Sequence, residues 1–274
     1  MSLSYSQLRL YRTCPRQYEY AVVKKLPRPI TPAESFGSSV HNALKKWGET
    51  EIRGQIPEDS QQSLFGKTDG SDKLSPESLH LISGLYPLKS DRLRDLWHQT
   101  FSPEVFATRM EADLARQRGE RLMEHFYQWW NKQSRTVLAV EKGFSLAMDG
   151  LTLTGRFDRV ENTDDGVHVI DFKTFRPPTP APNIDADLQL SIYAIAAEQE
   201  FDKPCTALTF LFLEEEKYTE HTTQRTPGQL ADAHKQILSL HNMIGERDFH
   251  PTPAAEKCKR CPYRNVCEAS AYRD

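Results

Sequence analysis

The sequence predicts an α/β domain in which a mixed central sheet is flanked by helices. Segments with helical spacing of apolar residues and segments typical of strands follow in a fixed order: a helix, a long helix, three strands, a helix, two strands and a helix. With 274 residues, 38% of them apolar, the chain can bury a sizeable core. We therefore expect one domain over residues 1–274, with carboxylates gathered at the centre of the sheet.

The first part of the chain is predicted to be mainly helical. Ser4 to Gln7 has the capping-box pattern, so a short helix should follow and end near Cys14. A second helix is expected over residues 36–47. Residues 51–104 are rich in Ser, Gly and Pro with weak periodicity, which indicates an insertion or a mobile lobe.

A long helix and an antiparallel meander are expected next. Apolar residues recur in steps of four or its multiples up to a helix end near Gln133: Phe106, Met110, Leu114, Leu122, Phe126 and Trp130. Residues 137–148 and 151–160 are typical of strands joined by the turn Asp149-Gly150, and residues 167–173 of a third strand. The remaining predicted elements are a helix at about 185–200, strands at about 206–214 and 218–224, and a helix at about 227–246.

Composition limits the classes of function. The formal net charge of −3 lacks the basic field of a protein that coats nucleic acid, so any such contact must use local patches. Two basic patches exist: Arg9, Arg12, Arg16, Lys24, Lys25 and Arg28 near the start, and Lys257, Lys259, Arg260 and Arg264 in the tail. Residues 1–10 lack a signal-peptide core, and the longest apolar stretch is about half a membrane helix. We expect a cytoplasmic protein without membrane contact.

The strongest chemical pattern is acidic. Because strand side chains alternate, Asp171 and Lys173 share one face of their strand, and a hairpin can bring Asp158 alongside them. Paired carboxylates flanked by apolar residues are costly to bury unless a cation neutralises them, and Mg²⁺ suits such oxygen ligands. In isolation the segment also fits an exposed strand with alternating charges.

Three further residues gain meaning from their order along the chain. His41 is expected on the second helix, and Gln189 and Tyr193 lie one helical turn apart on a later one. Taken singly, His41 is more often a satisfied surface or core histidine, Tyr193 a core residue and Gln189 a solvated one.

Together these residues resemble the RecB-type branch of the PD-(D/E)xK nucleases, which includes CRISPR-associated exonucleases and the nuclease domains of bacterial recombination helicases. Four ordered motifs carry the resemblance: Gly37-x-x-x-His41, Gly155-x-x-Asp158, Asp171-x-Lys173 and Gln189-x-x-x-Tyr193. The opening, from Leu3 to Tyr18, and the cysteine-rich ending, from Cys258 to Cys267, also resemble the family, while residues 51–103 do not. Glu141 is similar to a carboxylate often found on the strand before the acidic motif.

The resemblance implies a restriction-endonuclease-like fold and a metal-dependent nuclease site. In such a site Asp158 and Asp171, with His41, would hold Mg²⁺ or Mn²⁺, and Lys173 would orient the attacking water or stabilise the developing charge. Gln189 and Tyr193 would position the DNA strand or the lysine. The chain has Asp171 where many relatives have glutamate, which shortens the arm that reaches the metal.

The function implied is that of an exonuclease acting on DNA ends or single strands in repair, recombination or CRISPR-type defence. A helicase or CRISPR-type partner would supply unwound DNA, because the chain lacks a motor of its own. Two alternatives stay open: a catalytically inactive iron–sulfur DNA-binding module, and a defence endonuclease with the same site.

The cysteines indicate a metal rather than disulfides, because the expected compartment is reducing and the count of five is odd. Cys205 stands in an apolar strand segment and is expected to be a small buried hydrophobe. The other four resemble the family's iron–sulfur clasp of the two chain ends, in a tail at 251–274: Cys14, Cys258, Cys261 and Cys267. Zinc ribbons usually show two Cys-x₂-Cys pairs, so a 4Fe-4S cluster is favoured, with zinc as the alternative.

Overall fold

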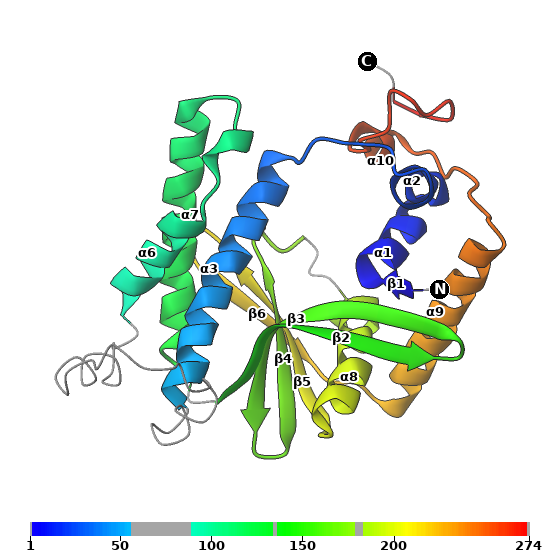
Figure 1. Cartoon of the computed structure of the whole chain (residues 1–274). Helices are drawn as coiled ribbons and strands as arrows, with labels where there is room; N and C mark the ends of the chain where they lie inside the picture. Colours follow the sequence, from blue (N-terminus) through cyan, green and yellow to red (C-terminus); the bar gives the residue numbers. More distant parts are fainter. Residues whose placement is uncertain (1, 56–88, 134–135, 179–182, 273–274) are drawn as a thin grey trace, which may run out of the picture.

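The computed structural model describes residues 2–55, 89–133, 136–178 and 183–272, and it has a mixed sheet between two groups of helices (Figure 1). The strands are β1 (Ser2–Ser4), β2 (Val137–Met148), β3 (Leu151–Thr163), β4 (Gly166–Lys173), β5 (Cys205–Leu213) and β6 (Tyr218–Thr223). The α-helices are α1 (Tyr5–Thr13), α2 (Pro15–Tyr18), α3 (Pro32–Gln55), α6 (Ser90–Thr100), α7 (Arg109–Trp130), α8 (Leu188–Phe201), α9 (Pro227–Gly245) and α10 (Ala255–Lys259). The π-turn η1 (Glu19–Val23) and the 3₁₀ turns η2 (Pro103–Val105) and η3 (Ile184–Ala186) complete the order. The predicted fold class is confirmed.

Strand β3 organises the sheet. One of its edges pairs with β2 in an antiparallel hairpin, closed by Asp149 and Gly150 with positive φ angles of 43° and 81°. The other edge is divided, because β1 runs parallel to residues 152–154 and β4 runs antiparallel to residues 159–163. Strand β5 then adds parallel to β4, and β6 antiparallel to β5. Within the described residues, positions 155–158 therefore lie where this edge passes from one partner strand to the next.

Each face of the sheet is covered by its own group of helices (Figure 1). Helices α1, α8 and α9 enclose one core with the residues of β3, and helices α3, α6 and α7 enclose a second core around three tryptophans. The alternation of side chains along β4 serves both, since Val169 faces the first core and Ile170 and Phe172 face the second. Among the described helices, none is both long and apolar enough to cross a membrane.

The strands follow the sequence prediction closely. Strand β2 has the predicted bounds, whereas β3 continues to Thr163 instead of ending at residue 160. Strand β1 was not predicted, because three residues carry no periodicity and their pairing with β3 is a tertiary contact. Helix α9 begins at Pro227 as expected.

Several predicted helix boundaries need correction. Helix α3 starts at Pro32 and reaches Gln55, well beyond residues 36–47. Helix α6 lies inside the range 51–104, and its Leu93 and Trp97 are fully buried in the second core. These parts of the expected insertion belong to the main domain, and residues 56–88, to which a mobile-lobe prediction is now confined, lie outside the described residues.

The predicted buried face of the long helix was partly wrong. Met110 and Leu114 of α7 are exposed, and the small residues Ala112 and Gly119 face inward instead. A Cβ atom on Gly119 would lie 1.9 Å from the ring of Trp97, so α6 and α7 pack this closely only because position 119 is glycine. Apolar spacing cannot distinguish a helix face that carries large side chains from one that is packed through small residues.

A buried ionic cluster ties the second core to the sheet. Arg159 of β3 is 2% exposed and donates to both carboxylate oxygens of Glu51 on α3, at 2.6 and 2.9 Å, and to Glu161 at 2.7 Å. The indole of Trp130 on α7 also donates to Glu51, at 2.7 Å. Because two helices and a strand meet at the Glu51 carboxylate, removal of Glu51 or Arg159 leaves a buried charge without its main partner.

We predict that Glu51→Ala lowers the free energy of unfolding by about 3–5 kcal/mol, because the buried Arg159 guanidinium loses both hydrogen bonds to Glu51 and keeps only its pair with Glu161. The control is Glu49→Ala on the same helix, which removes an exposed ion pair with Lys45 and should cost less than about 0.5 kcal/mol. Urea unfolding of both variants measures the difference. Equal effects of the two substitutions would show that the cluster contributes nothing specific.

Candidate active site

The sheet places three of the predicted site residues together. The ladder between β3 and β4 ends at the pair Arg159 and Ile170, so the next backbone N–H of β4, that of Phe172, needs another acceptor. The Asp158 Oδ2 atom accepts it at 2.8 Å. The carboxylate of one strand is thus fixed between the side chains of Asp171 and Lys173 on the other.

Asp171 is the most heavily contacted group of the site. It is 4% exposed, forms an ion pair with Lys173 through Oδ2, and accepts a hydrogen bond from Gln189 Nε2 at 2.8 Å through Oδ1. The Tyr193 hydroxyl lies 3.0 Å from the same Oδ1. Burial raises the pKa of the Asp171 carboxyl to about 6, and the nearby Asp158 carboxylate adds to this, while Lys173 acts in the opposite direction.

Helix α8 delivers Gln189 and Tyr193 to this carboxylate. The Gln189 amide also accepts from Lys173 Nζ at 3.0 Å, so one side chain holds both members of the ion pair. The helix start is fixed by Asp187, whose side chain accepts from Leu190 N at 3.0 Å. Arg225 reinforces it by donating to the carbonyl oxygens of Ile184 and Asp187.

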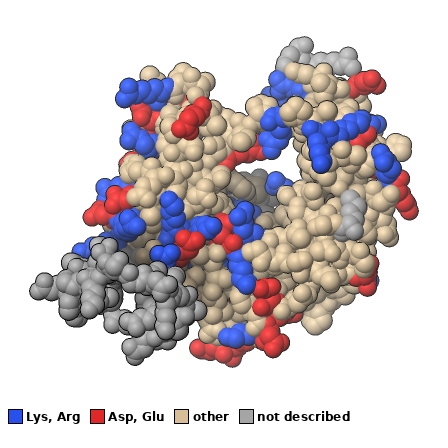
Figure 2. Space-filling model, in the orientation of Figure 1, with Lys and Arg blue, Asp and Glu red and all other residues tan. Residues whose placement is uncertain are grey.

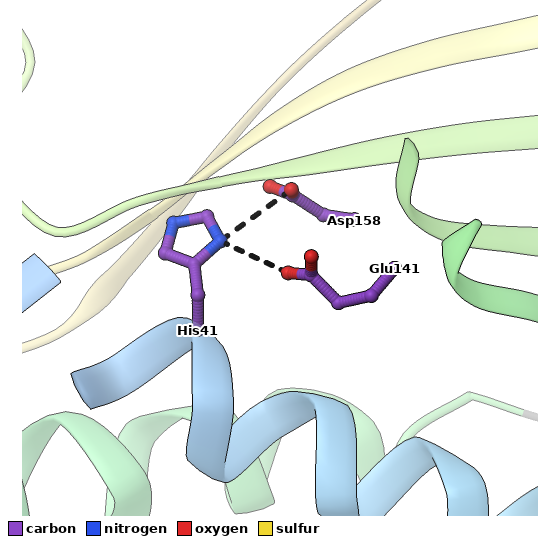
Figure 3. A group of neighbouring side chains, drawn as sticks. All are labelled: His41, Glu141 and Asp158. Atoms are coloured by element: carbon purple, nitrogen blue, oxygen red, sulfur yellow. Dashed lines mark ion pairs between the residues drawn. The ribbon is translucent and has the colours of Figure 1, made fainter. Parts of the chain in front are cut away.

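His41 approaches from the opposite side, on helix α3. Its Nδ1 atom lies 3.4 Å from Asp158 Oδ1 and 3.6 Å from Glu141 Oε1 (Figure 3). Among the described residues, these three form a group whose ligand atoms all lie within 4.8 Å of one another, a spacing that suits a metal ion. Burial alone would lower the pKa of His41, but the carboxylates of Asp158 and Glu141 raise it to about 10.

Glu141 has an unusual backbone. Its φ angle is +48° inside strand β2, a left-handed conformation that costs a residue with a Cβ roughly 1–2 kcal/mol. Its side chain is 9% exposed, and one oxygen pairs with Arg156 at 2.9 Å while the other faces His41. The sequence prediction carried Glu141 only weakly and left it out of the ligand set, since no pattern in the sequence reports a positive φ angle.

These residues line an open cleft. Beyond those already described, its walls are formed by Ser38, Asn42, Phe172, Thr174 and Phe175. Figure 2 shows a hollow near the middle of this face of the molecule, with Lys and Arg side chains beside it. A second groove, lined by Gln7, Arg9 and Arg28, lies along α1.

The first predicted basic patch is partly neutralised. Arg16 and Lys24 both pair with Glu19, at 2.6 and 3.1 Å, and Arg28 pairs with Glu34. Cations next to the groove along α1 are therefore fewer than the sequence suggested.

The four predicted cluster cysteines converge. Cys14, between α1 and α2, lines one small cavity with Cys258, Cys261 and Cys267 of the tail. Helix α2 and the tail around α10 lie side by side there (Figure 1), and Lys257 Nζ donates to the carbonyl oxygen of Thr13 at 2.9 Å.

The two kinds of cysteine differ in their surroundings. Burial would raise the pKa of the Cys14 thiol, but hydrogen bonds from the backbone of Thr252 and Gln17 lower it overall, which favours the thiolate that binds metals. Burial raises the pKa of Cys205 to about 12, so that thiol stays protonated. Cys205 does not line the cavity.

Comparison with known proteins identifies proteins that are similar to this chain. Residues 2–268 match the model of the PD-(D/E)XK nuclease superfamily. The CRISPR-associated exonuclease Cas4 of Francisella tularensis subsp. novicida is 31% identical over 116 residues, which span 42% of this chain and 56% of that protein. The gene 69 protein of Mycobacterium phage D29 is 22% identical over 96% of this chain and 95% of its own length. The chain thus spans about half the length of the first relative and nearly all of the second.

Solved structures show the same fold. A candidate exonuclease from Eubacterium rectale superposes with a TM-score of 0.50 at 10% sequence identity, covering 100% of this chain and 90% of that chain. The expected restriction-endonuclease-like arrangement, a mixed sheet with helices on both faces, agrees with this superposition and with the superfamily match.

We predict a pH dependence that His41 controls. Its pKa, raised to about 10 from 6.5, means that the folded, metal-free protein holds a proton that the unfolded chain releases above about pH 6.5. The resulting stabilisation is complete below about pH 6.5 and is lost as pH rises towards 10. The variant His41→Asn should therefore lose less stability across this range than the wild type, measured by urea unfolding in a chelator. Parallel pH profiles of the two proteins would contradict the raised pKa.

Proposed function

Because the chain belongs to the PD-(D/E)XK nuclease superfamily, as its ordered motifs predicted, we propose that it is a metal-dependent DNA exonuclease acting on free ends or single strands. The observation that carries this proposal is the meeting of Asp158, Asp171 and Lys173 where β3 passes from one partner strand to the next. The relative Cas4, which is named a CRISPR-associated exonuclease, supports the choice of activity.

The proposed metal site uses a revised set of ligands. His41, Glu141 and Asp158 offer one nitrogen and two carboxylates in a compact group, which fits Mg²⁺ or Mn²⁺. Asp171 remains a ligand in this proposal, since it lies beside Asp158 and the ion pair with Lys173 leaves its carboxylate in the same cleft. When bound, a divalent cation would supply Lewis acidity and lower the pKa of a coordinated water.

The remaining residues have roles that follow from their contacts. Lys173 directs its ammonium into the cleft, where it can orient the attacking water or stabilise the negative charge that develops on the phosphate. Gln189 fixes the distance between Lys173 and Asp171 by bonding both. Tyr193 is buried and restrains Asp171, so it positions the carboxylate rather than touching the substrate.

We further propose that the four converging thiols hold a 4Fe-4S cluster. A zinc ion bound at about 2.3 Å from each sulfur would draw the sulfurs to roughly 3.8 Å from one another. Among the described residues, the groups with ligand atoms within 4.8 Å do not include three of these cysteines, although all four line one cavity. The lack of a second Cys-x₂-Cys pair in the sequence favours a cluster of several irons over a single zinc ion.

The features of the same site bear on the two alternative functions. An inactive DNA-binding module would not need the strained backbone of Glu141 or the ordered ion pair of Asp171 with Lys173. A defence endonuclease would use the same residues, and substrate assays separate it from an exonuclease. The proposal also includes a helicase or CRISPR-type partner that supplies unwound DNA. It further includes a role in repair, recombination or defence, and a cytoplasmic location.

We predict that Asp171→Ala and Lys173→Ala each reduce DNA cleavage by at least about a hundredfold, because the first removes a proposed metal ligand and the second removes the ammonium proposed to stabilise charge on the phosphate. The matched controls are Asp165→Ala and Lys203→Ala, two exposed residues of the same types. End-labelled single strands, linear duplexes and covalently closed circles are incubated with Mg²⁺, with Mn²⁺ or with a chelator. Efficient cutting of closed circles would favour the endonuclease, and turnover by the two site variants would refute the site.

We predict that Cys14→Ser loses the bound iron and destabilises the protein by on the order of 4 kcal/mol, as for a cross-link that closes a long loop. Cys205, expected to be buried, is only partly buried in the structure, so Cys205→Ser, the matched control, should keep the iron and cost at most about 1–3 kcal/mol. Metal and sulfide analysis of anaerobically purified proteins measures both. Stoichiometric zinc without sulfide would replace the cluster by a zinc site, and iron retained by Cys14→Ser would show that the ends are not joined in this way.

A further inference from the structure

The exposed aromatic side chain of Phe175 is unusual for its place in the molecule. It is 54% exposed, follows Lys173 by two residues and lines the active-site cleft, whose other walls are mainly polar or charged. Single exposed apolar residues are common on protein surfaces, but this one stands among the groups proposed to carry the chemistry. Covering this ring would remove apolar surface from water, so binding of a flat apolar group to it would be favourable.

The ring is held in place rather than loosely attached. The backbone next to the ring is restrained, because the carbonyl oxygen of Thr174 accepts a hydrogen bond from Arg118 Nη2 of α7 at 3.0 Å. The Phe175 ring meets the buried ring of Phe212 on β5, with centroids 5.7 Å apart and planes at 79°. Helix α3 also approaches closely, since a Cβ on Gly37 would lie 3.3 Å from Thr174 Oγ1. The exposed part of the ring is therefore presented to the cleft on a fixed support.

We propose that Phe175 is a stacking platform for a nucleobase of the DNA strand in the active site. This inference rests on the proposed function and names how the strand is held. Residues two apart have Cα atoms at most about 7 Å apart, so a base on Phe175 belongs to a nucleotide close to the phosphate at Lys173. Aromatic rings bind any base through its flat face, which leaves the polar base edges in water.

The surroundings favour a nucleotide over an apolar protein partner. The side chain of Arg156, which also lines the cleft, is 64% exposed, and that of Arg176, next in sequence, is 74% exposed. Each already has a carboxylate partner, Glu141 and Glu214 respectively, but keeps most of its surface in water and can meet a phosphate. A ring with exposed cations nearby matches a base with its flanking phosphates. Because stacking tolerates every base, the platform suits an enzyme that degrades DNA of any sequence.

The test measures KM and kcat on short single-stranded DNA for the wild type, Phe175→Leu and Phe175→Trp. Stacking of one base is worth a factor of about 5 to 150, so Phe175→Leu should raise KM within this range while kcat stays nearly constant. Phe175→Trp should retain a low KM. Met110→Ala, which alters an exposed apolar residue outside the cleft, is the control and should change neither constant.

A second arm modifies the DNA instead of the protein. An abasic nucleotide moved along the strand should raise the KM of the wild type at one position and have no further effect there on Phe175→Leu, as expected for two partners of one contact. The base analogue 2-aminopurine at that position should lose fluorescence on binding in a chelator, where no cleavage occurs. Equal KM values for wild type and Phe175→Leu, or an abasic effect that is independent of residue 175, would overturn the proposal.

The two proposals fail in different ways. Wild-type protein that cleaves no DNA with either metal would refute the exonuclease, whereas normal cleavage by Phe175→Leu with an unchanged KM refutes only the stacking platform. Loss of fluorescence of 2-aminopurine in the chelator tests the platform even in a protein that does not cleave. Thermal unfolding of each variant verifies that it is folded before its constants are compared.

Discussion

The hydrogen bond from the Phe172 N–H to Asp158 Oδ2 is the contact on which the site depends. Strand β3 leaves β4 after the pair Arg159 and Ile170 in order to pair with β1, and a backbone donor on β4 is left at the point of separation. The carboxylate takes the place of the missing strand carbonyl. An acidic side chain is thereby held inside a sheet without a helix or loop to carry it, and the two strands diverge just enough to leave a cleft between them.

The charges in the cleft balance only while His41 holds its proton. Three carboxylates, those of Asp158, Asp171 and Glu141, lie within the reach of Lys173, His41 and Arg156. Burial is the main cause of the raised pKa of Asp171, whereas at His41 burial acts downward and the carboxylates of Asp158 and Glu141 raise the pKa. A divalent cation would displace the His41 proton and take over the role of neutralising the acids.

The sequence predicted the strands and the acidic pair well, because both follow from local alternation. The range of β2 and the shared face of Asp171 and Lys173 needed no tertiary information. Glu141 was left out of the predicted ligand set because its role depends on a backbone angle and on its distance from His41. Neither can be predicted from the spacing of residues in the sequence. Helix α6 was missed because its apolar residues are few and are buried only by α3 and α7. The contacts of Arg118 and Arg225 likewise join distant segments and were invisible in the sequence.

The left-handed backbone of Glu141 sets stability and chemistry against each other at one residue. Glycine adopts this conformation freely, so the substitution Glu141→Gly would relieve strain of roughly 1–2 kcal/mol while removing a carboxylate from beside His41. A laboratory selection for thermal resistance alone would tend to enrich that change and discard the proposed metal site with it. Resistance to heat is therefore a misleading guide to fitness at this position, and any stabilised version of the enzyme should be screened for cleavage before its backbone is idealised.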